Sequence, residues 1–148
     1  MDQKEFDKQL QNHIKNLLEI SWEYIYNSKN IENIFIYCLM GQNKYFDLIY
    51  QVGDKYFERH KIYLINSDFF VTDERQDWLI ENIVNERNLI ESLFNKFKRE
   101  VPFEIKITYS PKSTKLDLKF SYDDPLKNED SAIGDGFRNW IESLGITM

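Results

Sequence analysis

The segment Asn33–Val52 has the sequence NIFIYCLMGQNKYFDLIYQV and predicts an antiparallel β-hairpin. Its first arm, residues 33–39, is a run of β-branched and aromatic residues, so we expect a strand that is covered on both faces. Residues 41–44 are of turn-forming types, and residues 45–52 return with apolar side chains at every second position. The segment therefore predicts two neighbouring antiparallel strands.

Helical periodicity lies on either side of this hairpin. Upstream, residues 5–18 carry apolar side chains at helical spacing, which predicts a first amphipathic helix. Downstream, Asp73 and Gln76 resemble a capping pair and open a longer apolar stripe that continues to Phe97 and ends before Pro102. This stripe predicts a second, longer helix.

Two connecting segments are harder to assign. Residues 22–26 alternate between aromatic and other side chains, so we expect a strand to begin there and to end at a turn over residues 27–30. Residues 53–71 leave two alternatives open, because Ile62–Ile65 could form another strand while Phe69–Val71 could belong to a buried loop.

The C-terminal third predicts a second hairpin and a last helix. Apolar residues alternate with polar ones over residues 104–109 and again over residues 115–122, with a turn at residues 110–114. Clean alternation is typical of an antiparallel sheet with one apolar face, so we expect helices packed on a single side. Asp135 can cap a final helix that stops at Gly145. The prediction is one α+β domain over residues 1–148, in the order α-β-β(-β)-α-β-β-α.

Charge and cysteine content narrow the classes of function. The 148 residues carry a formal net charge of -6, which argues against a nucleic-acid-binding protein and favours a basic partner. A single cysteine, Cys38, excludes a disulfide framework and any zinc cluster built from cysteines, and suits a reducing compartment. We find no signal peptide or membrane span and expect a cytoplasmic protein.

Residue types that carry catalysis are sparse. His13 and His60 have no partners at a metal-ligand spacing, Cys38 lies within an apolar strand, and no phosphate-binding glycine loop occurs. We expect neither catalysis nor a cofactor or metal. Two alternatives stay open: Asp123 and Asp124 could hold a divalent cation, or either of them or His60 could act as an acid or base in a small enzyme. The glycines at 134 and 136 are predicted to form a flexible turn.

Acidic residues are the polar feature above background. Seven of them lie between Asp68 and Glu91, against two arginines, Arg75 and Arg87. A second acidic run begins after the last predicted strand. These carboxylates could be an ordinary solvated face, or they could meet a lysine- and arginine-rich partner and accelerate association. The candidate contacts are Asp73, Asp77, Glu81, Asp123 and Asp124.

Aromatic residues are also frequent, with nine tyrosines and eleven phenylalanines. Most of them should lie in the core. Some, such as Tyr37 or Tyr45, are expected to stay partly exposed, and exposed aromatic residues beside carboxylates make good hot spots for protein recognition.

Several segments together point to a family. They are the stretch SWEYIY at residues 21–26, IFIY at 34–37, the long acidic helix with Trp78, Leu93, Phe94 and Phe97, KLDLKFSYDD at 115–124, and RNWIESLGI at 138–146. In these segments the chain resembles the YezG-type immunity proteins, which include EsaG-like antitoxins of secreted nuclease toxins. The resemblance implies an α+β fold, no catalytic residues, and a cognate toxin domain as partner, expected to be basic and nuclease-like. The alternative is a non-catalytic scaffold or regulator that forms a homodimer, and the expected state is a monomer or a homodimer.

Overall fold

The computed structural model describes residues 2–148 and confirms the α+β class and the predicted element order. The optional third strand is present. The elements follow one another as α1 (Gln3–Tyr24), β1 (Asn33–Leu39), β2 (Tyr45–Val52), β3 (Lys55–Glu58), the short 3-10 helix η1 (Arg59–Leu64), α2 (Asp73–Lys96), β4 (Glu104–Ser110), β5 (Lys115–Ser121) and α3 (Asp135–Ser143). The segment left open, residues 53–71, thus forms β3 and η1, and the strand considered at Ile62–Ile65 is not formed.

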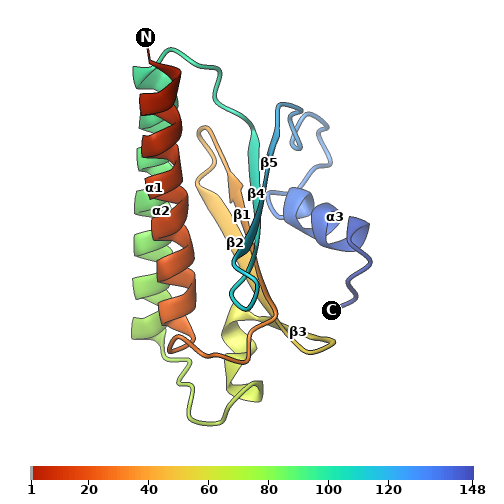
Figure 1. The fold of residues 1–148 in the computed structure, drawn as a ribbon. Coiled ribbons are helices and arrows are strands. Elements are labelled where there is room, and N and C mark those ends of the chain that lie inside the picture. Colours follow the sequence, from red (N-terminus) through yellow and green to blue (C-terminus); the bar gives the residue numbers. More distant parts are fainter. Residues whose placement is uncertain (1) are drawn as a thin grey trace.

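All five strands form one antiparallel sheet in the order β3-β2-β1-β4-β5 (Figure 1). The hairpin predicted from residues 33–52 supplies its middle, because β1 pairs with β2 on one side and with β4 on the other. At the centre, Ile36 lies opposite Leu48 and Ile107. The strand is buried on both faces, as its composition predicted.

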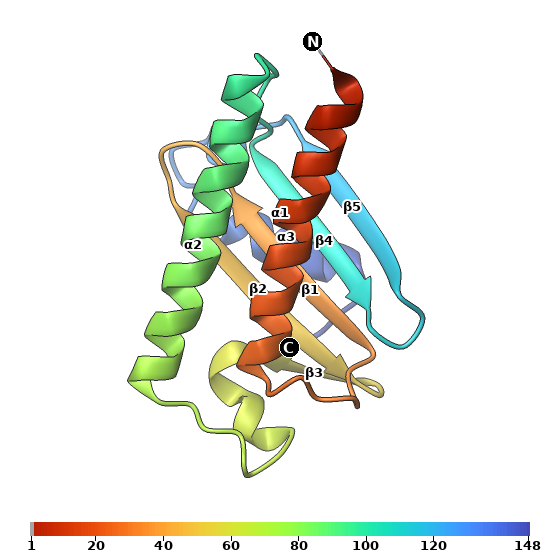
Figure 2. The same ribbon diagram turned by 60° about the vertical axis from the view of Figure 1, so that its left-hand side comes forward.

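The helices occupy both sides of the sheet (Figures 1 and 2). The long helices α1 and α2 pack side by side on one face, in agreement with the prediction. We predicted that every helix would pack on a single side of the sheet. This is wrong for α3, which lies on the opposite face. The cause is β1, whose residues Phe35, Tyr37 and Leu39 are all apolar on that second face. They are covered by Trp140 and Ile141 of α3.

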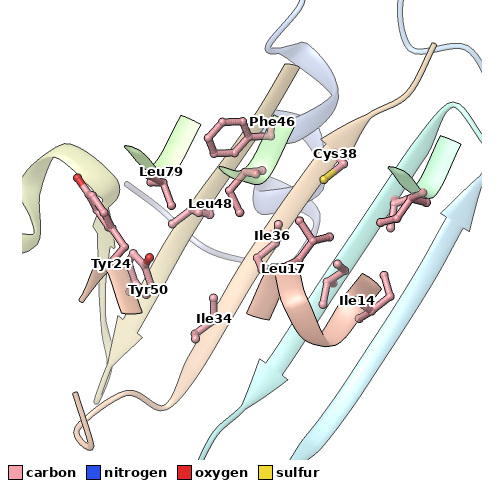
Figure 3. Packing of buried hydrophobic residues seen from close by; sticks show 14 of the residues in the cluster. Ile14, Leu17, Tyr24, Ile34, Ile36, Cys38, Phe46, Leu48, Tyr50 and Leu79 are labelled. Atoms are coloured by element: carbon pink, nitrogen blue, oxygen red, sulfur yellow. The ribbon is translucent and has the colours of Figure 1, made fainter. Parts of the chain in front are cut away.

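The larger core lies between the sheet and the two long helices. Ile34, Ile36 and Cys38 of β1 point into it, and side chains from both helices meet them there (Figure 3). Complete burial of a side chain of this size stabilises the fold by about 1.5–3 kcal/mol. This core fixes how the helices sit over the sheet.

The strand predicted at residues 22–26 is wrong, since α1 continues to Tyr24. Its buried stripe runs on through Leu17, Ser21 and Tyr24 at helical spacing. Ser21 is the reason the stripe was hard to see: a polar residue stands at a core position, with its hydroxyl donating to the Leu17 carbonyl at 2.8 Å. Tyr26 and Asn27 then take positive φ values and end the helix.

The start of α2 agrees with the prediction, but its cap is a different residue. Thr72, not Asp73, accepts the backbone N–H of Arg75 through its side-chain hydroxyl oxygen, at 3.1 Å. In α3 the expected cap Asp135 is the first helical residue and instead accepts the N–H of Ala132 at 2.7 Å. The flexible turn expected around Gly136 is also wrong, because Gly136 is buried against the sheet.

Candidate partner-binding site

The three acidic candidates on α2 share one exposed face of that helix. Asp73, Asp77 and Glu81 follow one another at intervals of four residues, which brings their side chains into line along the helix. Within residues 2–148 none of these carboxylates has a lysine, arginine or histidine nitrogen at ion-pair distance. The face therefore presents uncompensated negative charge to solvent.

Arg75 lies in the same turn of α2 but does not neutralise this face. Its guanidinium turns inward, donates to the Tyr24 carbonyl at 2.6 Å, and stacks 4.2 Å from the centre of the Tyr26 ring. A cation over an aromatic face is attracted by the ring quadrupole. The Arg75 side chain thus stabilises the C-terminal end of α1 and is not available to the acidic face.

Arg87, the second arginine of this stretch, is only 1% exposed. Its Nε donates to the Leu39 carbonyl at 2.9 Å, and a terminal nitrogen reaches both the Gly41 carbonyl and Glu91. Glu91 in turn accepts the N–H of Gly41 at 2.8 Å. The pair fastens the β1–β2 turn to α2. Both arginines counted against the seven acidic residues are therefore directed away from the acidic face.

Exposed aromatic side chains lie at the same end of the molecule. Phe70, just before α2, is 64% exposed, and its N–H donates to the hydroxyl of Tyr26 at 3.3 Å. Tyr26 itself stacks on Phe69 with ring centroids 5.1 Å apart. We call Asp73, Asp77, Glu81, Tyr26 and Phe70 the acidic–aromatic end. The sequence points to neither residue as a contact, because its pattern assigns Tyr26 to a strand and Phe70 to a possible buried loop, whereas the structure exposes both side chains.

The second acidic pair is elsewhere. Asp123 and Asp124 follow β5, which ends at the opposite end of the molecule from the start of α2 (Figures 1 and 2). Asp123 is exposed, whereas Asp124 accepts the N–H of Leu126 at 2.8 Å and so shapes its own loop. The structure does not bring the five candidate contacts together into one site.

The expected exposure of two tyrosines holds for only one of them. Tyr45 is half-buried, but Tyr37 is completely buried, which corrects the prediction. Its hydroxyl donates to Glu104 at 2.6 Å, and burial raises the pKa of Tyr37 far above its usual value. Tyr37 is a structural residue under α3.

The groups considered for catalysis are scattered. His13 on α1 contacts Glu86 on α2 at 2.9 Å, His60 lies 3.3 Å from Glu58, and Cys38 is buried, which raises the pKa of its thiol to about 12. In the part of the chain that the structure describes, no three His, Cys, Asp or Glu side chains gather as metal ligands. None of the helices formed by residues 2–148 has the length and apolar character needed to cross a bilayer.

Among the aspartates and glutamates of residues 2–148, Asp47 is the one whose carboxyl pKa is clearly shifted. Burial raises the pKa above 3.8, although the Leu48 N–H donates to one oxygen at 2.8 Å and the Tyr45 hydroxyl to the other at 3.2 Å. Arg59 lies 3.9 Å away and opposes the shift. Asp47 lies on β2 opposite Tyr37 of β1, on the face of the sheet that α3 covers, and is therefore not part of the acidic face of α2.

A search against protein-family models and a search of curated proteins both found no match to this chain.

Proposed function

We propose that this chain is a cytoplasmic immunity protein that binds the toxin domain of a secreted nuclease and blocks it, with no catalysis of its own. One observation carries the proposal: Asp73, Asp77 and Glu81 line an exposed helix face from which both neighbouring arginines are turned away. Nucleases bind phosphates through cationic surfaces, and a negative face complements such a surface in charge.

The energetics of α2 support a role for this face outside the fold. Like charges four residues apart on a helix are destabilising by about 0.2–0.5 kcal/mol per pair. The helix dipole offsets this cost for Asp73 in the first turn, but its effect fades beyond that turn, before Glu81. The stability of the helix therefore does not explain the charge of Glu81, whereas a basic partner does.

The aromatic residues of the acidic–aromatic end can supply the binding energy that charge alone does not provide. Electrostatic complementarity mainly raises the association rate, while buried aromatic anchors supply most of the binding energy at an interface. Phe70 and Tyr26 are placed to be such anchors. The resemblance to YezG-type immunity proteins implies the same kind of partner.

Co-expression tests the proposal. The full chain is produced together with the C-terminal domain of the secreted protein encoded beside it, and the complex and the nuclease activity are both measured. We expect a stable complex in which the nuclease activity is lost. Free domains that keep full activity would overturn the proposal.

A pair of matched triple variants links such a complex to the acidic face. The first variant combines Asp73→Asn, Asp77→Asn and Glu81→Gln. The control neutralises three exposed carboxylates elsewhere, at Asp54, Glu129 and Asp130, and so removes the same net charge. Only the first variant should weaken inhibition of the toxin domain. Equal effects of the two would show that net charge, and not this face, matters.

A further inference from the structure

One edge strand of the sheet lies outside the helical layer. Two packed helices span roughly 20 Å, whereas neighbouring strands are about 4.8 Å apart, so the pair covers about four strands. In a five-stranded sheet β5 is left over, and Figure 2 shows it beyond α1. Its apolar side chains are correspondingly open: Leu116 is 45% exposed, and Leu118 and Phe120 are half-buried.

The uncovered face forms one wall of an apolar groove. The groove has a volume of about 640 Å³ and lies between α1 and the β4–β5 hairpin. Ile14, Leu18 and Trp22 line it from α1, and Leu116 and Leu118 line it from β5. A surface of this kind, beside an open strand edge, is suited to the addition of another strand.

The register of the sheet shows which backbone groups of β5 point outward. The Phe103 carbonyl accepts the Met40 N–H and points toward β1, whereas the Phe103 N–H donates to the Ser121 carbonyl at the end of β5. The next carbonyl along the chain, that of Glu104, therefore points toward β5, and every second residue of β4 from Ile105 onward directs its backbone groups toward β1. The residues between them face β5 and pair with its odd-numbered residues. The N–H and C=O groups of Leu116, Leu118 and Phe120 therefore point away from the sheet.

The polar face of β5 carries alternating charges. Lys119 lies directly opposite Lys106 of β4, a like-charge pair, and its nearest carboxylate is Asp117 of the same strand at 4.0 Å. Lys106 has its own contact with Glu104 at 3.8 Å. Lys119 and Asp117 are both exposed. Because β5 is the edge of the sheet, no neighbouring strand on its outer side places an opposite charge beside either of them.

We propose that β5 pairs antiparallel with β5 of a second copy of this chain, about a two-fold axis through Leu118, and so joins the two sheets. This register places Asp117 opposite Lys119 of the second copy and, by symmetry, Lys119 opposite Asp117 of the second copy. Leu116 meets Phe120 of the second copy on the apolar face. The outward backbone groups of all three apolar residues then find partners.

The neighbouring registers are disfavoured by charge. An axis through Asp117 would set Asp117 against itself and Lys115 against Lys119 of the second copy. An axis through Lys119 would set that lysine against itself. Like charges directly opposite one another are destabilising in a sheet, so the sequence of β5 selects the axis at Leu118.

Sedimentation velocity on the full chain tests the dimer. We expect a wild-type dimer and at least about tenfold weaker self-association for Asp117→Lys or for Lys119→Asp alone, since each substitution places like charges opposite one another. An equimolar mixture of the two variants, and the double variant, should regain the dimer because opposite charges face each other again. A wild-type monomer up to millimolar concentration, or a dimer indifferent to both substitutions, would overturn the proposal.

A cross-link tests the register. Only the residue on the axis meets its own copy, so Leu118→Cys should form an intermolecular disulfide on mild oxidation, whereas the control Leu116→Cys should not. Native Cys38 does not compete, because it is buried within the core. Circular dichroism confirms that each variant is folded. If Leu116→Cys cross-links as readily as Leu118→Cys, the register is wrong.

The dimer does not depend on the proposed function. Helix α2 lies over the β2 side of the sheet, away from β5 (Figure 2). Monomeric variants should therefore still bind a toxin domain through the acidic–aromatic end, and loss of one property without the other separates the two proposals.

Discussion

Gly136 of α3 lies directly against the hydroxyl of Tyr37 on β1, with no room for a side chain between them. A Cβ atom on Gly136 would overlap both that hydroxyl and the carboxylate of Glu104, to which the Tyr37 hydroxyl donates a hydrogen bond. The close approach lets α3 bury Trp140 and Ile141 on the second face of the sheet. One missing methyl group therefore sets the distance between the third helix and the strand beneath it.

Gly136→Ala should push α3 away from the sheet and lower the free energy of unfolding by about 1–3 kcal/mol, as overpacking of a tight core does. Urea denaturation followed by intrinsic tryptophan fluorescence measures this loss. Gly134→Ala is the control, because its new methyl would meet only the end of the Tyr45 side chain, at 3.3 Å, and should cost much less. Equal losses for both variants would contradict the close contact.

The raised pKa of Asp47 predicts a specific pH dependence of stability. Burial makes the folded protein hold this proton more tightly than the unfolded chain, whose carboxyl titrates near 3.8. Asp47 therefore contributes stability that is fully present below pH 3.8 and is lost as the pH rises through the folded pKa. The free energy of unfolding is measured against pH for the wild type and for Asp47→Asn. Above pH 3.8, the free energy of unfolding of the wild type should fall relative to that of the variant. A relative gain with rising pH would mean that the folded pKa is lowered.

Among the charged residues, Arg87 should be the one whose substitution lowers the free energy of unfolding most. Arg87→Ala leaves the carbonyls of Leu39 and Gly41 without their donor and Glu91 without its cation, so we expect a loss of about 3 kcal/mol in the free energy of unfolding. Arg87→Lys keeps the charge but not the forked donor set, and should lie between this variant and the wild type. A lysine variant as stable as the wild type would show that charge alone suffices.

The triple neutralisation at Asp73, Asp77 and Glu81 should slow association with a basic toxin domain by about tenfold or more at low salt. The association rate should also become less dependent on salt, because fewer charges remain to be screened. Stopped-flow mixing over a range of ionic strength measures both effects. Unchanged association kinetics would remove this face from the interface.

Phe70→Ala separates binding from folding at the same end of the chain. The side chain is largely exposed, so its loss should change the free energy of unfolding by no more than about 0.5 kcal/mol. As an interface anchor it should still cost more than about 1 kcal/mol of binding, seen mainly as faster dissociation. Surface plasmon resonance measures the dissociation rate, and a rate equal to that of the wild type would exclude Phe70 as an anchor.

Much of the architecture was predictable because it depends on local patterns. The bounds of β1 and β2 follow from runs of β-branched and aromatic residues closed by a turn, and α2 follows from a long apolar stripe with acidic residues in its first turn. The end of α1 was not predictable in this way. Ser21 places a polar residue in the buried stripe, and only its hydrogen bond to Leu17 makes that position acceptable.

The sequence alone determined the order of the elements, the double-faced burial of β1 and the excess of negative charge. The tertiary structure decided which charges remain available. Arg75 and Arg87 count as surface cations in any sum over residues, but packing turns one onto Tyr26 and buries the other beneath the β1–β2 turn. It likewise placed Asp123 far from the α2 carboxylates and left β5 uncovered. Such outcomes depend on where distant segments meet and on how many strands two helices can cover, and no local pattern of residues contains that information.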